Sequence, residues 1–373
     1  MSVTQVPLQD LKRIHDPIEA ELKNAFERVL HANSYIMGPE LTQFEQACAE
    51  YLGVKHAIGC SSGTDTLLLA MMALEIGPGD EVICPSYTFF ATAGSIWRLG
   101  AKPVFVDSDP LSFNCDIADI KTKITSKTKA IMPVHLFGLA ADLDPLLALS
   151  QEFDIPVIED AAQAIGARYK EQMVGSVGTF GSFSFFPAKN LGGFGDGGLL
   201  TTHNDSLAEK ARVLRAHGSK PKYHHHLVGG NFRLDALQAA LLNVKLPYCD
   251  RYAEQRRQNA DDYARKLQNL PLTLPVAPNA DYYHVYNQYV IQLESPATRN
   301  RLEAHLQAKK IGTAIYYPIP LHLQACFRSL GYQKGDLPIC ERLAETTLAL
   351  PIFPGMTAAE MDYVCQAIHS FFA

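Results

Sequence analysis

Lys189 is the residue of this sequence best suited to covalent chemistry. It stands in the segment 182–198, SFSFFPAKNLGGFGDGG, between an apolar run and a glycine-rich turn. Its apolar neighbours predict that the amine is partly desolvated. Burial lowers the pKa of an amine and supplies the neutral nucleophile that Schiff-base chemistry requires. The position alone leaves a second interpretation open, an ordinary lysine in a surface loop.

Two adjacent carboxylates, Glu159 and Asp160, follow the apolar run 156–158. Neighbouring residues of a strand point to opposite faces of a sheet, so at most one of the two faces a given ligand. That carboxylate would cap the next helix, bind a metal or pair with a protonated ring nitrogen. The spacing does not separate these three roles.

The small polar turn 61–65, SSGTD, lies between a predicted strand and a predicted helix. Backbone N–H groups at a helix N-terminus bind phosphate readily. The alternative is an ordinary helix N-cap. His224, His225 and His226 are interpreted as a polar loop, because consecutive histidines cannot all reach one metal ion from a regular element.

The composition excludes several classes of protein. A net charge of -6 and the lack of a long Lys/Arg run argue against nucleic acid as a partner. No apolar stretch reaches membrane-spanning length and the first 16 residues do not resemble a signal peptide, so we expect a cytoplasmic protein without membrane contact. Eight cysteines without a CxxC pair indicate neither a zinc knuckle nor a disulfide framework.

The elements that must position these residues alternate along the first half of the chain. Apolar runs alternate with helical patterns, which predicts a mostly parallel sheet covered by helices on both faces. Asp16 and Pro17 predict an N-capped helix before this region. The predicted strands are 56–61, 81–85, 103–107, 130–137 and 156–160, and the predicted helices are 65–74, 90–99 and 145–153. In such a sheet, ligands bind at the carboxyl ends of the strands, where the candidate residues fall.

The second half of the chain has a different pattern of predicted strands and helices. Short strands at 182–186 and 198–202 precede a long predicted helix, 235–267, that would connect two domains. A strand at 286–293, helices near 299–309 and 340–348, and a final helix opened by a Thr357–Glu360 capping box follow. We therefore expect an α/β protein with a large domain, 1–250, and a smaller C-terminal α+β domain, 251–373.

Several long segments together resemble the DegT/DnrJ/StrS family of sugar aminotransferases, which are pyridoxal-phosphate enzymes of fold type I. The resemblance covers almost the whole chain, and its most specific parts are SSGTDTLLLA, GDEVICPSYTFFATA, VIEDAAQAIGA, SFSFFPAKNLGGFGDGG and GGNFRLDALQAA. It implies a large cofactor-binding α/β domain and a reaction that moves an amino group from glutamate to a nucleotide-linked keto sugar.

The resemblance also implies roles for individual residues. Lys189 matches the lysine that holds pyridoxal 5′-phosphate as an aldimine and later moves a proton, with the pyridoxamine phosphate form arising in turnover. Asp160 matches the carboxylate on the pyridine nitrogen. The other implied cofactor contacts are Phe89 on the ring face, Gln163 at the phenolic oxygen, Gly63, Thr64 and Ser184 at the phosphate, and Asn231 from the other subunit of a homodimer.

On the substrate side, Tyr317 and His322 match the family's sugar-side loop. The loop 316–322 and the stretch 222–235 resemble those of members that aminate carbon 3. The product would be an amino sugar for a surface polysaccharide or a glycoside.

Three alternatives are carried alongside this prediction. A sugar dehydratase of the same fold would have histidine at position 189. A non-catalytic sensor of sugar or cofactor would lack some of the residues that bind the cofactor. An amino-acid decarboxylase would place an arginine for the substrate carboxylate, and the candidates Arg299, Arg301 and Arg328 cannot be judged from the sequence.

Overall fold

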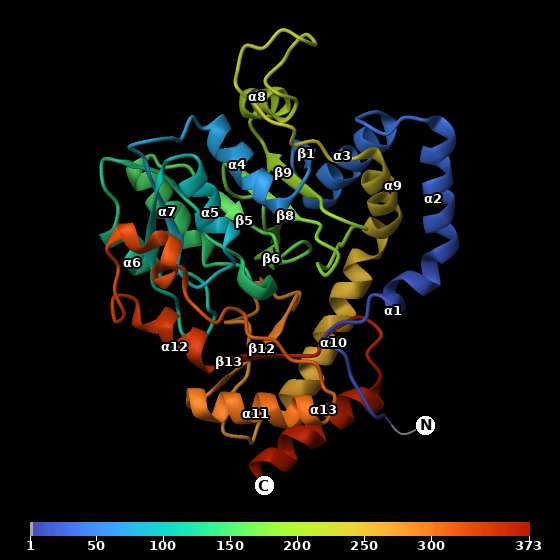
Figure 1. Ribbon diagram of the computed structural model, residues 1–373, viewed down its shortest axis with the longest axis vertical. Coiled ribbons are helices and arrows are strands. Elements are labelled where there is room, and N and C mark those ends of the chain that lie inside the picture. The colour runs from blue at the N-terminus through green and yellow to red at the C-terminus, as the bar shows by residue number, and fades with distance from the viewer. Residues whose placement is uncertain (1–2) are drawn as a thin grey trace.

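Two sheets joined edge to edge form the centre of the larger part of the protein, as the computed structural model of residues 3–373 shows (Figure 1). The bridges Ile131–Val157 and Val134–Asp160 join them. The four-stranded sheet has the order β1 (His56–Cys60), β9 (Gly198–Thr202), β8 (Phe180–Ser184), β5 (Ile158–Asp160). The three-stranded sheet has the order β3 (Lys102–Val106), β2 (Glu81–Pro85), β4 (Thr128–Ile131).

Most strands of this sheet are parallel, which confirms the prediction. The pairs β2–β3, β2–β4 and β5–β8 are parallel, whereas β9 runs antiparallel to both β1 and β8. Parallel strands leave their carboxyl ends at one edge of the sheet, and this is the edge where the candidate residues gather.

Helices cover both faces of the sheet, as predicted, because the alternating side chains of each strand enter two different cores. On β2, Ile83 packs into one core and Val82 and Cys84 pack into the other. The first core includes side chains of α3 (Pro39–Leu52), α7 (Leu143–Phe153) and α9 (Ala236–Lys245). The second includes side chains of α4 (Gly63–Ala73), α5 (Ala91–Arg98) and α8 (Asp205–Arg215).

A third core lies around a small antiparallel sheet near the C-terminus (Figure 1). Its strands have the order β10 (Leu272–Thr273), β12 (Tyr289–Leu293), β13 (Thr347–Leu350). Around it pack α10 (Cys249–Leu267), α11 (Pro296–Ala308) and α13 (Ala358–Phe372). The predicted capping box of α13 is confirmed, with Thr357 and Glu360 bonding each other's backbone N–H groups. The division at residue 250 stays a prediction, and Val6 also packs into this core.

The remaining α-helices and strands complete the described chain. They are α1 (Lys12–His15), α2 (Glu19–Ala32), α6 (Ile117–Thr122), α12 (Pro338–Thr346), β6 (Arg168–Tyr169), β7 (Gln172–Met173) and β11 (Tyr282–Tyr283). Among residues 3–373, no helix combines the length and apolar character needed to cross a membrane.

Two predicted helices differ from the structure. The helix expected over 235–267 is divided by a 3-10 turn, Leu246–Tyr248, because Pro247 has no N–H to continue the helical bonding. Asp16 does not cap the first helix. It begins a 3-10 turn, Asp16–Ile18, and its carboxylate binds the Lys12 ammonium instead.

Candidate active site

A cavity of about 410 Å³ lies at the carboxyl edge of the large sheet. Its walls come from the ends of β5 and β8, the start of α4, the turn that carries Lys189, and two segments of the C-terminal third of the chain. It is lined by Gln9, Ser62, Gly63, Thr64, Leu67, Thr88, Phe89, Ala91, Val134, Asp160, Ala162, Gln163, Ser184, Phe186, Ala188, Lys189, Asp196, Asn287, Gln288, Tyr316 and Tyr317. Eight of the ten predicted site residues are in this set.

Lys189 reaches the cavity from a tight turn that follows β8. Its backbone N–H donates to the Phe186 carbonyl (2.8 Å), and the Gly193 N–H donates to the Phe185 carbonyl (2.7 Å). Gly192 must be glycine, because a Cβ there would come within 2.1 Å of the Pro187 carbonyl oxygen. Burial lowers the pKa of the Lys189 amine to about 8, although the Asp160 carboxylate opposes the shift. A neutral, nucleophilic amine is therefore accessible near neutral pH.

Asp160 faces the cavity, and the neighbouring Glu159 faces away from it. Asp160 is buried, and its carboxylate accepts hydrogen bonds from the Thr92 hydroxyl (2.8 Å) and the Ala162 N–H (3.2 Å). Burial raises the pKa of Asp160, while these two donors and Lys189 oppose the shift. The structure thus brings Asp160 and Lys189 to one cavity.

Glu159 is fully buried on the other face of β5 and stabilises the fold. Its carboxylate accepts hydrogen bonds from His135 Nε2 (2.9 Å) and from the N–H groups of Gly175, Val177 and Gly178. Burial alone would raise the pKa of Glu159, but the His135 and backbone donors outweigh it and hold the pKa below its ordinary value. Of the two carboxylates left open by the sequence, only Asp160 is available to a ligand.

The N-terminus of α4 forms the end of the cavity suited to a phosphate. Ser62 caps the helix by accepting from the Asp65 N–H, while Gly63 and Thr64 carry the first N–H groups of the helix, which have no partner within it. Ser184 lies directly against Gly63, since a Cβ at Gly63 would come within 2.7 Å of the Ser184 Cβ. The helix-cap interpretation of the SSGTD turn is confirmed, whereas the phosphate interpretation stays a prediction for residues that line the cavity.

Phe89, Gln163 and Tyr317 form a contiguous polar and aromatic wall. Gln163 accepts from the Phe137 N–H (2.7 Å) and donates to the Tyr317 hydroxyl (3.0 Å). The rings of Phe89 and Tyr317 lie 5.9 Å apart, and Phe89 is 57% exposed. An exposed ring at the mouth of a cavity is available for stacking on a planar ligand.

Two of the predicted site residues do not line the cavity. Asn231 is exposed and belongs to the segment after α8, where it bridges Ala216. His322 is only 1% exposed and is held between Ser86 Oγ (2.7 Å) and Glu341 Oε1 (3.2 Å). Neither lines the cavity of this chain, so the prediction that His322 contacts substrate has no support from the geometry.

Sequence reasoning missed Thr92 and Asn287. Thr92 lies within a segment quoted for the resemblance, but no local pattern shows that its hydroxyl reaches Asp160. Asn287 arrives from the C-terminal part of the chain, about 100 residues beyond Lys189. Lys189 is the only cationic side chain among the described residues that line the cavity, and Arg299, Arg301 and Arg328 are not among them.

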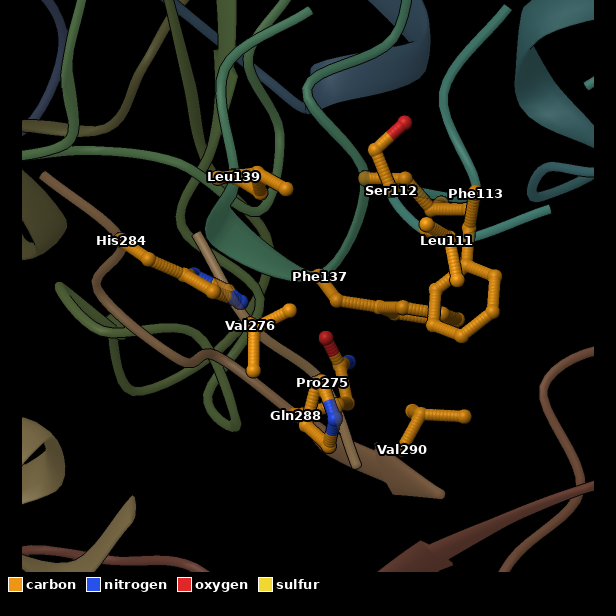
Figure 2. A pocket seen from close by; sticks show the side chains of 11 residues that line it. Leu111, Ser112, Phe113, Phe137, Leu139, Pro275, Val276, His284, Gln288 and Val290 are labelled. Carbon is orange, nitrogen blue, oxygen red and sulfur yellow. The ribbon is translucent and has the colours of Figure 1, made fainter. Parts of the chain in front are cut away.

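A second, much smaller cavity adjoins the first across Gln288, which lines both. Figure 2 shows it enclosed mainly by apolar side chains such as Phe137, Val276 and Val290. Its volume of about 10 Å³ is enough for about one water molecule, so it cannot hold a substrate.

Comparisons with known proteins agree over almost the whole chain. The model of the DegT/DnrJ/EryC1/StrS aminotransferase family matches residues 16–369. A protein of Geobacillus stearothermophilus named pleiotropic regulatory protein is 47% identical over 98% of this chain and 98% of its own. The UDP-N-acetyl-3-dehydro-alpha-D-glucosamine 3-aminotransferase of Acidithiobacillus ferrooxidans is 45% identical over 98% of this chain and 97% of its own. The crystal structure of S. venezuelae DesV in complex with a ketimine intermediate superposes with a TM-score of 0.95, at 39% identity and 99% coverage of both chains.

Proposed function

This chain belongs to the DegT/DnrJ/EryC1/StrS aminotransferase family, and from that premise we propose that it transfers the amino group of glutamate to a keto group of a nucleotide-linked sugar. One observation carries the proposal for this chain. The half-buried amine of Lys189, with its pKa lowered to about 8, and the buried carboxylate of Asp160 line the same cavity. A nucleophilic amine and a carboxylate that pairs with a ring nitrogen are the two groups this chemistry needs.

The cofactor is pyridoxal 5′-phosphate, and the residues of the cavity fit it. Gly63, Thr64 and Ser184 would hold the phosphate at the start of α4. Phe89 would cover the ring, and Gln163 would lie beside its phenolic oxygen. Asp160 would bind the ring nitrogen.

In the proposed mechanism, the cofactor when bound supplies a carbonyl that accepts the amine and a ring that takes up electrons from the reacting carbon. Lys189 Nζ would hold the cofactor covalently at that carbon, and once released it would move a proton between the substrate carbon and the cofactor carbon. Asp160 would keep a proton on the ring nitrogen, and the Thr92 hydroxyl holds that carboxylate in place by donating a hydrogen bond to it. Because one lysine serves both halves of the reaction, glutamate and the sugar use the same site in turn.

The sugar position belongs to the same proposal. Amination at carbon 3 is supported by the relative from A. ferrooxidans, whose name specifies a 3-aminotransferase. An amino sugar for a surface polysaccharide or a glycoside would be the product. Free cysteines throughout the described chain, of which Cys326 is exposed, are compatible with work in the cytoplasm.

A homodimer with shared active sites completes the proposal. Asn231 is exposed and does not line the cavity of its own chain, and it would reach the cofactor phosphate of the other subunit. Large exposed apolar side chains offer surface for such contacts, among them Phe26, Leu30, Ile36, Phe194 and Val228. A contribution from the other subunit also agrees with the cavity lining of one chain, in which Lys189 is the only cationic side chain among the described residues.

Hybrid dimers test the shared site. We expect Lys189→Ala and Asn231→Ala proteins each to lose most activity alone. Refolding them together in equal amounts should restore about a quarter of wild-type activity, because half of the dimers are mixed and each of these holds one intact site. Sedimentation should report a dimer, and a monomeric active enzyme would contradict this part of the proposal.

The central test is chemical. Borohydride reduction of the holoenzyme and peptide mapping should find the cofactor mass on the peptide that contains Lys189. The holoenzyme with glutamate should then release 2-oxoglutarate and aminate a 3-keto nucleotide sugar faster than a 4-keto one. No adduct at Lys189 would refute the mechanism. An adduct without turnover across the substrate panel would favour a sensor, a role in keeping with the name of the Geobacillus relative.

A further inference from the structure

Asn287 forms part of the cavity wall just before β12, opposite the large sheet. Its side chain is only 1% exposed. The backbone N–H of Asn287 donates to the Phe137 carbonyl (2.8 Å), and the Phe137 N–H in turn donates to Gln163. Asn287 is therefore linked through two hydrogen bonds to Gln163, another residue of the cavity wall.

Both polar atoms of the Asn287 carboxamide are buried and have no hydrogen-bond partner among residues 3–373. Buried polar side-chain atoms in folded proteins nearly always have a partner, because leaving them without one destabilises the fold. A donor and an acceptor held without partners at the wall of a ligand cavity indicate that a ligand supplies the partners.

The backbone that carries this carboxamide is held firmly. The buried guanidinium of Arg256 donates to the carbonyl oxygens of Tyr286 (3.3 Å), Asn287 (3.5 Å) and Ile352 (2.8 Å). Arg256 thus ties the segment at Asn287 to the C-terminal part of the chain. The carboxamide is presented in a fixed position, which lowers the entropic cost of binding.

The chemistry of the carboxamide selects among the groups of the two substrates. A carboxylate only accepts hydrogen bonds, so a glutamate carboxylate would satisfy Nδ2 and leave Oδ1 facing another oxygen. A hydroxyl both donates and accepts, so sugar hydroxyls satisfy both atoms. We propose that the Asn287 carboxamide binds hydroxyl groups of the substrate sugar and is a determinant of sugar specificity, an inference that rests on the proposed function.

The test separates the two halves of the reaction with the Asn287→Leu holoenzyme. Leucine nearly matches asparagine in shape but neither donates nor accepts. UDP-N-acetylglucosamine and dTDP-glucose are the probes, since they carry the sugar without a keto group and bind without turnover, and UDP and dTDP serve as references. Calorimetry should show that the substitution weakens binding of at least one nucleotide sugar by about 10-fold, while binding of the nucleotides alone stays within about twofold.

Two further measurements exclude a merely structural role. The rate at which glutamate changes the cofactor absorbance should stay within about twofold of wild type. The melting temperature of Asn287→Leu should equal or exceed that of wild type, because an unpartnered buried amide has been removed. Asn287→Asp keeps the acceptor but not the donor, so it should give an intermediate loss of sugar binding and serves if the leucine variant does not fold.

Tyr289→Phe is the matched control. The Tyr289 hydroxyl is also buried without a partner, but it lies in the small core and does not line the cavity. Its removal should leave sugar binding unchanged. The inference is overturned if Asn287→Leu slows the glutamate half-reaction as strongly as it weakens sugar binding, or if sugar binding does not change. It is also overturned if wild type binds neither sugar more tightly than its nucleotide. A wild-type holoenzyme that does not respond to glutamate would instead refute the proposed function.

Discussion

Glu159 and Asp160 are adjacent in β5, yet their surroundings move the pKa values of their carboxyls in opposite directions. Burial raises the pKa of Asp160, and on the other face of the strand His135 and three backbone N–H groups hold the pKa of Glu159 down. The strand therefore directs the Asp160 carboxylate to the cavity, whereas the Glu159 carboxylate stabilises the fold. Substitution of each should separate chemistry from stability.

Replacement of Asp160 by asparagine should abolish most turnover while the protein stays folded. The amide keeps the shape of the side chain and its acceptor for Thr92, but it cannot hold a proton on a ring nitrogen. We expect kcat to fall by at least about 100-fold, which corresponds to about 2.7 kcal/mol in the barrier. Turnover kinetics and thermal melting check this, and a variant with wild-type kcat would remove Asp160 from the mechanism.

Glu159→Gln should have the opposite effect, a loss of stability with the cavity chemistry intact. The glutamine amide nitrogen cannot accept the hydrogen bonds that the carboxylate accepts from His135 and the backbone, and each buried donor left without a partner costs about 1–3 kcal/mol. Because the folded-state pKa of Glu159 lies below its ordinary 4.5, its stabilisation is present above that pH and is lost as the pH falls through the depressed value. Denaturant unfolding at neutral and acidic pH should show a difference from wild type that shrinks in acid. An equal difference at all pH values would be inconsistent with this account.

The hydroxyl of Thr92 should lower the pKa of the Asp160 carboxyl. Thr92→Val removes a donor to the carboxylate, so the pKa of Asp160 rises further. The ionised carboxylate is the form proposed to act, and therefore the acidic limb of the kcat/KM profile should move to higher pH. Loss of a hydrogen bond to a charged group also predicts about 10-fold lower activity near neutral pH. Thr92→Ser restores the hydroxyl and should recover the wild-type profile.

Lys189 should react with its cofactor at a lower pH than an ordinary lysine. Because the pKa of Lys189 is about 8, the fraction of neutral amine rises as the pH passes about 8 and then reaches a plateau. This midpoint lies well below the ordinary lysine pKa of 10.5. The rate of cofactor uptake by apoenzyme, followed by absorbance against pH, should show this midpoint. Asp160→Asn removes the charge that opposes the shift, so its midpoint should lie lower still. A rate that keeps rising to pH 10 would contradict the desolvated amine.

Gly63→Ala should weaken retention of the cofactor. The added Cβ would come within 2.7 Å of the Ser184 Cβ, so one wall of the proposed phosphate site must move. Overpacking of this kind costs about 1–3 kcal/mol. We expect a higher Kd for pyridoxal 5′-phosphate together with a lower melting temperature. Gly77→Ala serves as the comparison, because Gly77 has no positive φ and an added Cβ there meets only the Leu99 carbonyl oxygen, at 4.0 Å.

The local sequence predicts that candidate reactive side chains lie directly after strands of the sheet. The apolar neighbours and glycine-rich turn of Lys189 indicated an amine that could be desolvated but left a surface lysine open, and the SSGTD turn predicted the start of α4. Alternation of apolar and helical patterns predicted the mostly parallel sheet with helices on both faces. These predictions succeed because side-chain period, turn chemistry and helix capping depend on residues close together in the chain.

What only the tertiary structure decided is which of these groups meet. The choice of Asp160 over Glu159 depends on how β5 pairs with β8 and on the helices packed against each face, because strand pairing fixes the direction of every side chain. Thr92 reaches Asp160 from 68 residues earlier in the chain, and Asn287 reaches the cavity from beyond α10. Such contacts carry no local signal, since they are created only when distant segments pack together.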